Sequence, residues 1–114
     1  MEPFPFPSLV QSILSCWESV SHVKGGFVRN WVTWKSKSGS RKIRFEIGGN
    51  RWCMNKHRAH KSNHILFIVD LHQSCFYQRC YDSDCQSYIS PPFPISPQES
   101  DVVSSYFDAE SIIE

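Results

Sequence analysis

Four side chains able to bind a metal, at fixed spacings, constrain this chain more than any other feature. Cys53 and His60 lie in RWCMNKHRAHKSN, and Cys80 and Cys85 lie in CYDSDC, which gives the pattern C-x6-H-x19-C-x4-C. The apolar segment 65–71 between the pairs is typical of a strand and too short to cross a membrane. Two ligand pairs at one end of a hairpin can converge on one tetrahedral Zn²⁺. Four protein ligands fill the coordination shell of the ion and leave no position for a catalytic water, so the predicted site is structural.

Other residues compete for these positions. His57 or His64 could replace His60, and Cys75 could replace Cys80. His57 stands between two basic residues, which favours exposure, and Cys75 lies inside a predicted strand, which favours packing. The chain opens without the basic and apolar segments of a signal peptide, so a cytosolic, nuclear or organellar setting is expected. In such a setting, paired cysteine and histidine more often bind metal than form disulfides.

Charge is divided unevenly along the chain. All twelve Lys and Arg residues fall between Lys24 and Arg79, a span with two acidic residues, and the seven acidic residues that follow Arg79 have no basic neighbour. A basic centre interleaved with aromatic residues predicts a polyanion-binding module, and the acidic end predicts an interaction tail. The competing interpretation is a solvated surface with uneven charge.

Hydrophobic periodicity predicts a small α+β domain stapled by zinc. The expected elements are an N-terminal amphipathic helix over 8–21 and strands over 27–35, 41–47, 65–71 and 75–79, arranged as β-hairpins around one site of three cysteines and one histidine. Residues 1–7 are expected as an extended leader, 8–90 as the helix and zinc domain, and 91–114 as a proline-rich linker and a disordered acidic tail. No stretch is long and apolar enough to span a membrane.

Three blocks of the sequence resemble a known family. An R-W-C and R-A-H-K-S-N block, a hydrophobic strand, and Y-Q-R-C-Y-D-S-D-C follow one another as in the zinc-finger domain of PrimPol, the eukaryotic DNA-directed primase-polymerase, and in the primase subunit of herpesvirus helicase-primases. The resemblance is specific over about residues 45–90 and weaker over 4–44. It implies one structural zinc ion whose ligands are Cys53, His60, Cys80 and Cys85.

The same resemblance implies support for DNA primer synthesis during replication and damage tolerance, in the nucleus or the mitochondrion. The implied ligands are single-stranded DNA template and a nucleoside triphosphate, and the basic residues suited to their phosphates are Arg51, Arg58, Lys61, Arg41, Lys42 and Arg44. No catalytic residue is predicted, because the primase core with its D-x-E pair would precede this domain. The literal match Asp108-Ala-Glu110 lies in the acidic tail. We therefore expect a carboxy-terminal piece of a primase-polymerase, inactive alone.

The acidic tail has its own interpretation. It resembles the segments through which PrimPol binds the single-strand DNA-binding protein RPA, and acidic and apolar residues together suit a basic groove. The apolar residues expected to make that contact are Val102, Val103, Tyr106, Phe107, Ile112 and Ile113. The alternative function for the whole chain is a zinc-stapled protein-interaction module with no nucleotide role.

Overall fold

A five-stranded antiparallel sheet, a two-stranded hairpin, two α-helices and one short 3-10 helix make up the described part of the fold. The computed structural model describes residues 2–113, with side chains described as far as residue 109. The elements are α1 (Pro7–Ser21), β1 (Phe27–Lys35), β2 (Arg41–Gly48), β3 (Trp52–Cys53), β4 (Arg58–Ala59), β5 (Ile65–Asp70), β6 (Cys75–Cys80), the 3-10 helix η1 (Ser83–Cys85), β7 (Phe93–Pro94) and α2 (Pro97–Ile113). The main sheet has the strand order β1-β2-β5-β6-β7, and β3 and β4 form a separate hairpin. The predicted small α+β fold is confirmed.

Alternation along β2 sets the two faces of the main sheet. Its inward residues are Ile43, Phe45 and Ile47, all buried, and its outward residues are Lys42, Arg44 and Glu46. β2 pairs with β1 on one side and β5 on the other, so Phe45 lies between Trp31 and Phe67. Because side chains alternate along each strand, each of these three inward residues meets an apolar neighbour on an adjacent strand. The four predicted strands agree with the structure to within one residue at each end.

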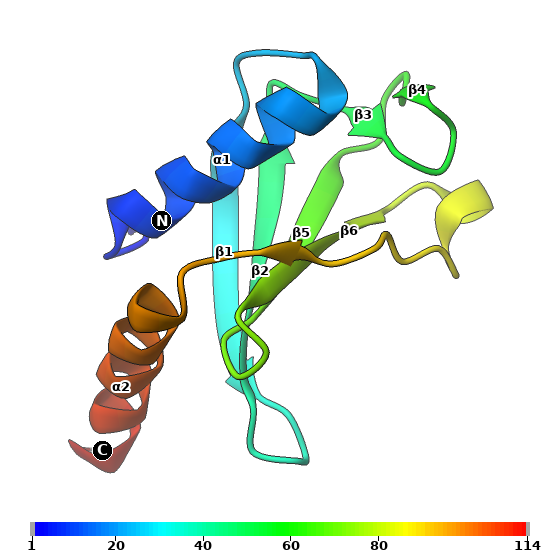
Figure 1. Cartoon of the computed structure of the whole chain (residues 1–114). Coiled ribbons are helices and arrows are strands. Elements are labelled where there is room, and N and C mark those ends of the chain that lie inside the picture. Colours follow the sequence, from blue (N-terminus) through cyan, green and yellow to red (C-terminus); the bar gives the residue numbers. More distant parts are fainter. Residues whose placement is uncertain (1, 114) are drawn as a thin grey trace.

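Helix α1 packs on the inward face of the sheet. Leu9, Ile13 and Trp17, each four residues apart, are buried there, and the Trp17 ring lies 5.1 Å from the ring of Phe67. Figure 1 shows α1 lying across β1 and β2. The helix begins at Pro7, one residue before its predicted start, because proline is well tolerated in the first helical turn. Among the described residues, no helix is long and apolar enough to cross a membrane.

The segment predicted as a linker and a disordered tail contains a short strand and a helix in the structure. Phe93–Pro94 adds the edge strand β7 beside β6, which proline permits because an edge strand leaves some N–H groups unpaired. Pro97 then opens helix α2, and the Ser96 hydroxyl accepts a hydrogen bond from the Glu99 N–H at 3.2 Å, as an N-cap does. The proline-rich and acidic composition of this segment led to the prediction of a linker and tail, although the segment forms helix α2 in the domain.

Two of the predicted partner-binding residues belong to the core instead. Val103 and Phe107 are buried, and being four residues apart they share one face of α2. Val102 and Tyr106 are exposed on the same helix, so a partner contact stays a prediction for them. The side chains of Ile112 and Ile113 lie outside the described part of the chain.

The leader also joins this core. Phe4 is buried, with its ring 4.9 Å from Phe45 and 5.9 Å from Phe107. The first residues of the chain and helix α2 therefore close the same end of the inward face, and Figure 1 shows both ends of the chain on that side.

An ion pair between a buried arginine and a partly exposed aspartate anchors α2 to the sheet. Arg41 is buried on the inward face, and its guanidinium donates two hydrogen bonds to Asp108, at 3.2 Å from Nε and 2.8 Å from the terminal nitrogen. This hydrogen bonding, together with the nearby charge of Lys35, lowers the pKa of the Asp108 carboxyl below its usual value. Arg41 is therefore not part of an accessible basic surface. Asp108, the aspartate of the D-x-E match, has a structural role as the partner of Arg41.

We expect Asp108→Ala to destabilise the domain by about 1–2 kcal/mol, because the buried guanidinium loses a carboxylate that is itself partly exposed to water. Urea unfolding at pH 7 measures the change. Asp101→Ala, an exposed position on the same helix, is the matched control. Equal stabilities of the two variants would contradict the anchoring role of Arg41.

Candidate metal centre

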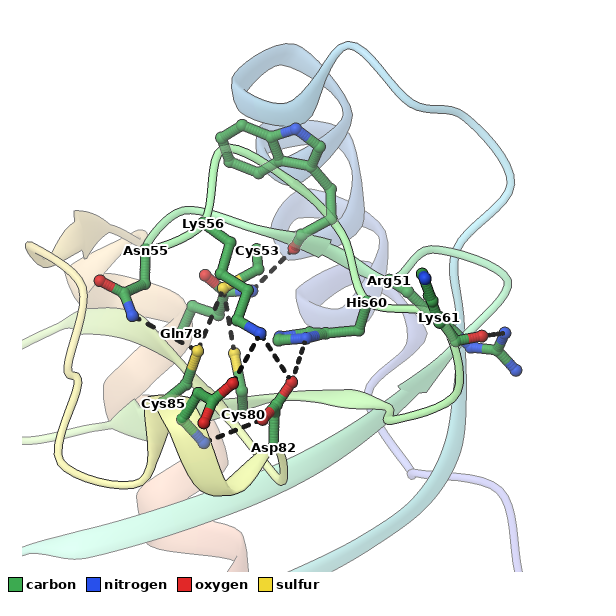
Figure 2. A network of polar contacts seen from close by, with 12 residues as sticks. Arg51, Cys53, Asn55, Lys56, His60, Lys61, Gln78, Cys80, Asp82 and Cys85 are labelled. Atoms are coloured by element: carbon green, nitrogen blue, oxygen red, sulfur yellow. Dashed lines mark hydrogen bonds and ion pairs between the residues drawn. The ribbon is translucent and has the colours of Figure 1, made fainter.

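Three thiols and one imidazole converge at one end of the sheet. Cys53, His60, Cys80 and Cys85 are all buried, and one ligand atom from each lies within 4.8 Å of the others. The Cys53 sulfur is 3.6 Å from that of Cys80 and 3.7 Å from that of Cys85. Figure 2 shows these side chains pointing toward one another. The four residues predicted from spacing are thus the four that the fold brings together.

Short elements present each ligand. The β3–β4 hairpin pairs Cys53 with Arg58, and the turn between them includes His57 at φ 54, a left-handed conformation. The His60 N–H donates to the carbonyl of Arg51 at 2.9 Å, which extends the hairpin to the second ligand. Cys80 ends β6, where the sheet fixes its direction, and Cys85 ends η1. The site therefore joins the small hairpin to the main sheet.

The donor set fits a soft or borderline cation such as Zn²⁺. Both ring nitrogens of His60 are shielded from water without a properly directed hydrogen bond, although Nδ1 lies 3.0 Å from a carboxylate oxygen of Asp82. Burial and the neighbouring Cys53 and Cys85 thiols raise the pKa of the Cys80 thiol. A cation at the centre supplies a partner for the imidazole and stabilises thiolates, so it removes both costs.

Charged and polar groups surround the ligands. Asp82 accepts from the Asp84 N–H at 2.9 Å, and its other oxygen lies 3.1 Å from Lys56 Nζ. These contacts, with the Asp84 N–H as the largest cause, lower the pKa of the Asp82 carboxyl, so it is ionised at neutral pH beside His60. A carboxylate next to one imidazole nitrogen orients the ring and leaves the other nitrogen for a metal. The Asn55 side chain also donates to the Cys85 sulfur at 3.4 Å.

Gln78 is a supporting residue that the sequence reasoning missed. It is fully buried, its amide nitrogen donates to the Trp52 carbonyl at 2.8 Å, and its amide oxygen accepts from the Met54 N–H at 3.0 Å. Its side chain therefore holds the backbone on both sides of Cys53. The alternation along β6 could have indicated that Gln78 is buried, because Gln78 shares a face with the inward Phe76 and Cys80.

The competing ligands lie elsewhere. His57 is exposed and packs its ring 6.2 Å from that of Trp52, and His64 contacts Arg29 at 3.1 Å. Cys75 lies at the far end of β6 from Cys80, and Cys16 lies on α1. Among the described residues, only the predicted four form a group of cysteine, histidine or acidic side chains close enough to share a metal.

The predicted phosphate-binding residues divide into two groups. Arg58 and Lys61 line a polar hollow of about 270 Å³ that also contains His60 and Asp82. The exposed Arg51 lies beside it and donates from its guanidinium to the Lys61 carbonyl at 3.1 Å. Lys42 and Arg44, by contrast, lie on the outward face of the main sheet with Arg41 turned to the inward face.

Comparison with known proteins identifies a family and several relatives to which the chain is similar. The sequence profile described as Herpesviridae UL52/UL70 DNA primase matches residues 29–98. The chain is similar to the DNA-directed primase/polymerase protein of Danio rerio, 47% identical over 57 residues that cover 48% of the chain and 11% of that protein. The protein of the same name from Homo sapiens is 34% identical over 93 residues, which cover 80% of the chain and 16% of the relative. The chain thus spans a small part of the curated relatives it matches. No solved structure matches it significantly.

Proposed function

The chain belongs to the Herpesviridae UL52/UL70 DNA primase family, and from this we propose that it is a zinc-bound module that supports primer synthesis by holding an initiating nucleoside triphosphate against template DNA. Its metal, in this proposal, is one structural Zn²⁺ on Cys53, His60, Cys80 and Cys85. With four protein ligands the ion shapes the domain and activates no water. The chemistry of nucleotide joining belongs to a catalytic core outside these residues.

The hollow beside the metal centre is the observation that carries the proposal. Arg58 and Lys61 flank the ligand His60 there, and Arg58 is paired in register with the ligand Cys53. A bound ion therefore fixes the backbone from which both cations project. A planar guanidinium can grip a phosphate through two parallel hydrogen bonds.

This arrangement suits the most difficult step of primer synthesis, the joining of the first two nucleotides. Joining the first two nucleotides requires two small reactants to be held together without a primer strand, and positioning alone can lower such a barrier by several kcal/mol. Arg58, Lys61 and the neighbouring Arg51 would hold the triphosphate of the first nucleotide. Elongation of an existing primer would depend on them less, because base pairing already positions the strand.

A titration with a short primer paired to single-stranded template tests the proposal. The primer is used with and without a 5′-triphosphate, and binding is followed by fluorescence anisotropy at several salt concentrations. We expect the Arg51→Ala and Arg58→Ala double variant to lose about tenfold or more of the affinity that the triphosphate adds. The slope of affinity against salt should also become shallower.

Lys37→Ala is the control, since Lys37 is an exposed cation in the turn between β1 and β2. Zinc content by elemental analysis shows whether the double variant keeps its metal. A metal-replete double variant that binds the triphosphate primer as tightly as Lys37→Ala would refute the phosphate-binding role and favour a protein-interaction module.

A further inference from the structure

The outward face of the main sheet carries no α-helix among the described residues. Both helices contribute their buried side chains to the core on the inward face. Strand register places the outward side chains in three rows across β1, β2, β5 and β6. The rows are Trp34, Lys42, Asp70 and Cys75; then Val32, Arg44, Ile68 and Tyr77; then Asn30, Glu46, Leu66 and Arg79.

Two cations on this face lack an acidic partner. Ion pairs occupy the first and third rows, where Lys42 meets Asp70 at 3.7 Å and Arg29 meets Glu46. Arg44 lies between these pairs, and within the described residues no carboxylate comes within ion-pair distance of it. Its Nε is shielded from water and makes no hydrogen bond.

Arg79 is the second such cation. It donates only to the Gln86 carbonyl, at 2.9 Å, among the described contacts. The middle and one edge of the face therefore carry positive charge that the protein itself does not neutralise.

A hollow with an apolar floor lies beside these cations. Leu66 and Ile68 are buried in its floor, Arg79 and Tyr81 stand at its sides, and its volume is about 430 Å³. Tyr81 is exposed, as is Trp34 farther across the same face. An apolar floor, an exposed aromatic ring and a guanidinium are what a nucleobase contacts when it stacks on a protein.

We propose that this outward face binds single-stranded DNA, with a base in the hollow against Tyr81 and a backbone phosphate on Arg44. The charge favours a polyanion, and the aromatic side chains favour unpaired bases over a duplex, whose bases are already stacked. This inference rests on the proposed function and assigns the template strand to a surface separate from the triphosphate hollow.

One loop separates the two hollows. Asp82 lines the polar hollow, and its neighbours Tyr81 and Ser83 line the hollow on the sheet. Cys80, a predicted metal ligand, borders the sheet hollow as His60 borders the polar one. A template base and a triphosphate bound in these hollows would lie on opposite sides of the segment that the metal fixes.

Binding of fluorescent oligo(dT) without any triphosphate tests this surface on the zinc-loaded chain. We expect Arg44→Gln to weaken binding about fivefold or more and to reduce the salt slope by about 0.7, the value for one lost contact to a single strand. Tyr81→Leu should weaken binding about fivefold or more without changing that slope, because it removes stacking and no charge. Tyr81→Phe keeps the ring and should bind as the unaltered protein does.

Lys37→Gln controls for the loss of one exposed positive charge, and circular dichroism with zinc analysis controls for folding. The inference would be overturned if Arg44→Gln and Tyr81→Leu both bound oligo(dT) as tightly as Lys37→Gln does. It would also be overturned if the unaltered protein did not bind oligo(dT). The triphosphate experiment stays separate, because the Arg51→Ala and Arg58→Ala double variant should keep oligo(dT) affinity while losing the increment from the triphosphate. Either binding proposal can therefore be refuted while the other stands.

Discussion

Cys80→Ser is expected to abolish metal binding and, with it, the cooperative unfolding transition of the domain. Cys80 joins β6 to the metal centre, and it is one of three sulfur ligands from three separate elements. Structural zinc contributes about 10–16 kcal/mol of apparent binding free energy in small zinc domains, which is comparable to the whole stability of a typical fold. Elemental analysis should find about one zinc per unaltered chain and none in the variant.

Thermal unfolding followed by circular dichroism measures the loss of structure. Cys16→Ser is the matched control, because Cys16 is a half-buried cysteine on α1 and takes no part in the metal centre. That variant should keep its zinc and a sharp transition. A metal-free Cys80→Ser protein that still unfolds cooperatively would show that the core alone holds the fold.

Gln78→Leu is expected to destabilise the domain by about 2–6 kcal/mol and to weaken metal affinity by about 10–100-fold. Leucine fills most of the buried volume but leaves the Trp52 carbonyl and the Met54 N–H without partners, and each unsatisfied group costs about 1–3 kcal/mol. Because those groups flank Cys53, the ligand loses its fixed direction, and changes to such supporting residues typically cost this much affinity.

Urea unfolding of the zinc-loaded protein gives the stability change, and competition with a chromogenic chelator gives the metal affinity. Gln73→Leu supplies the comparison, since Gln73 is exposed in the turn between β5 and β6. If Gln78→Leu matched Gln73→Leu in both measurements, the side chain of Gln78 would have no part in shaping the centre.

Local patterns in the sequence were sufficient for the main sheet, and they narrowed the metal ligands to a few candidates. β2 alternates so strictly that Ile43 and Arg44 could be assigned to opposite faces, and the structure confirms the assignment. A tetrahedral site restricts residue type and spacing, which favoured Cys53, His60, Cys80 and Cys85. The family resemblance then chose these four over His57, His64 and Cys75. The apolar stripe of α1 was equally clear, since Leu9, Ile13 and Trp17 recur at helical spacing.

Long-range contacts account for what the sequence did not reveal. Helix α2 has a modest apolar face, and only the core contacts of Val103 and Phe107 and the pairing of Asp108 with Arg41 explain its position. Arg41 was expected among exposed cations, although its alternation with Ile43 already placed it on the inward face. Partners 67 residues apart in the chain cannot be read from local periodicity.

The contact between Phe4 and Phe107 has a consequence for how this domain can be built into larger proteins. Because a packed residue near the start of the described chain touches one near its end, both connections to a larger polypeptide would leave from the same side of the domain. Such a unit can be placed between two other domains without forcing them apart. The outward sheet face and the loop that carries the candidate metal centre would then stay clear of both connections.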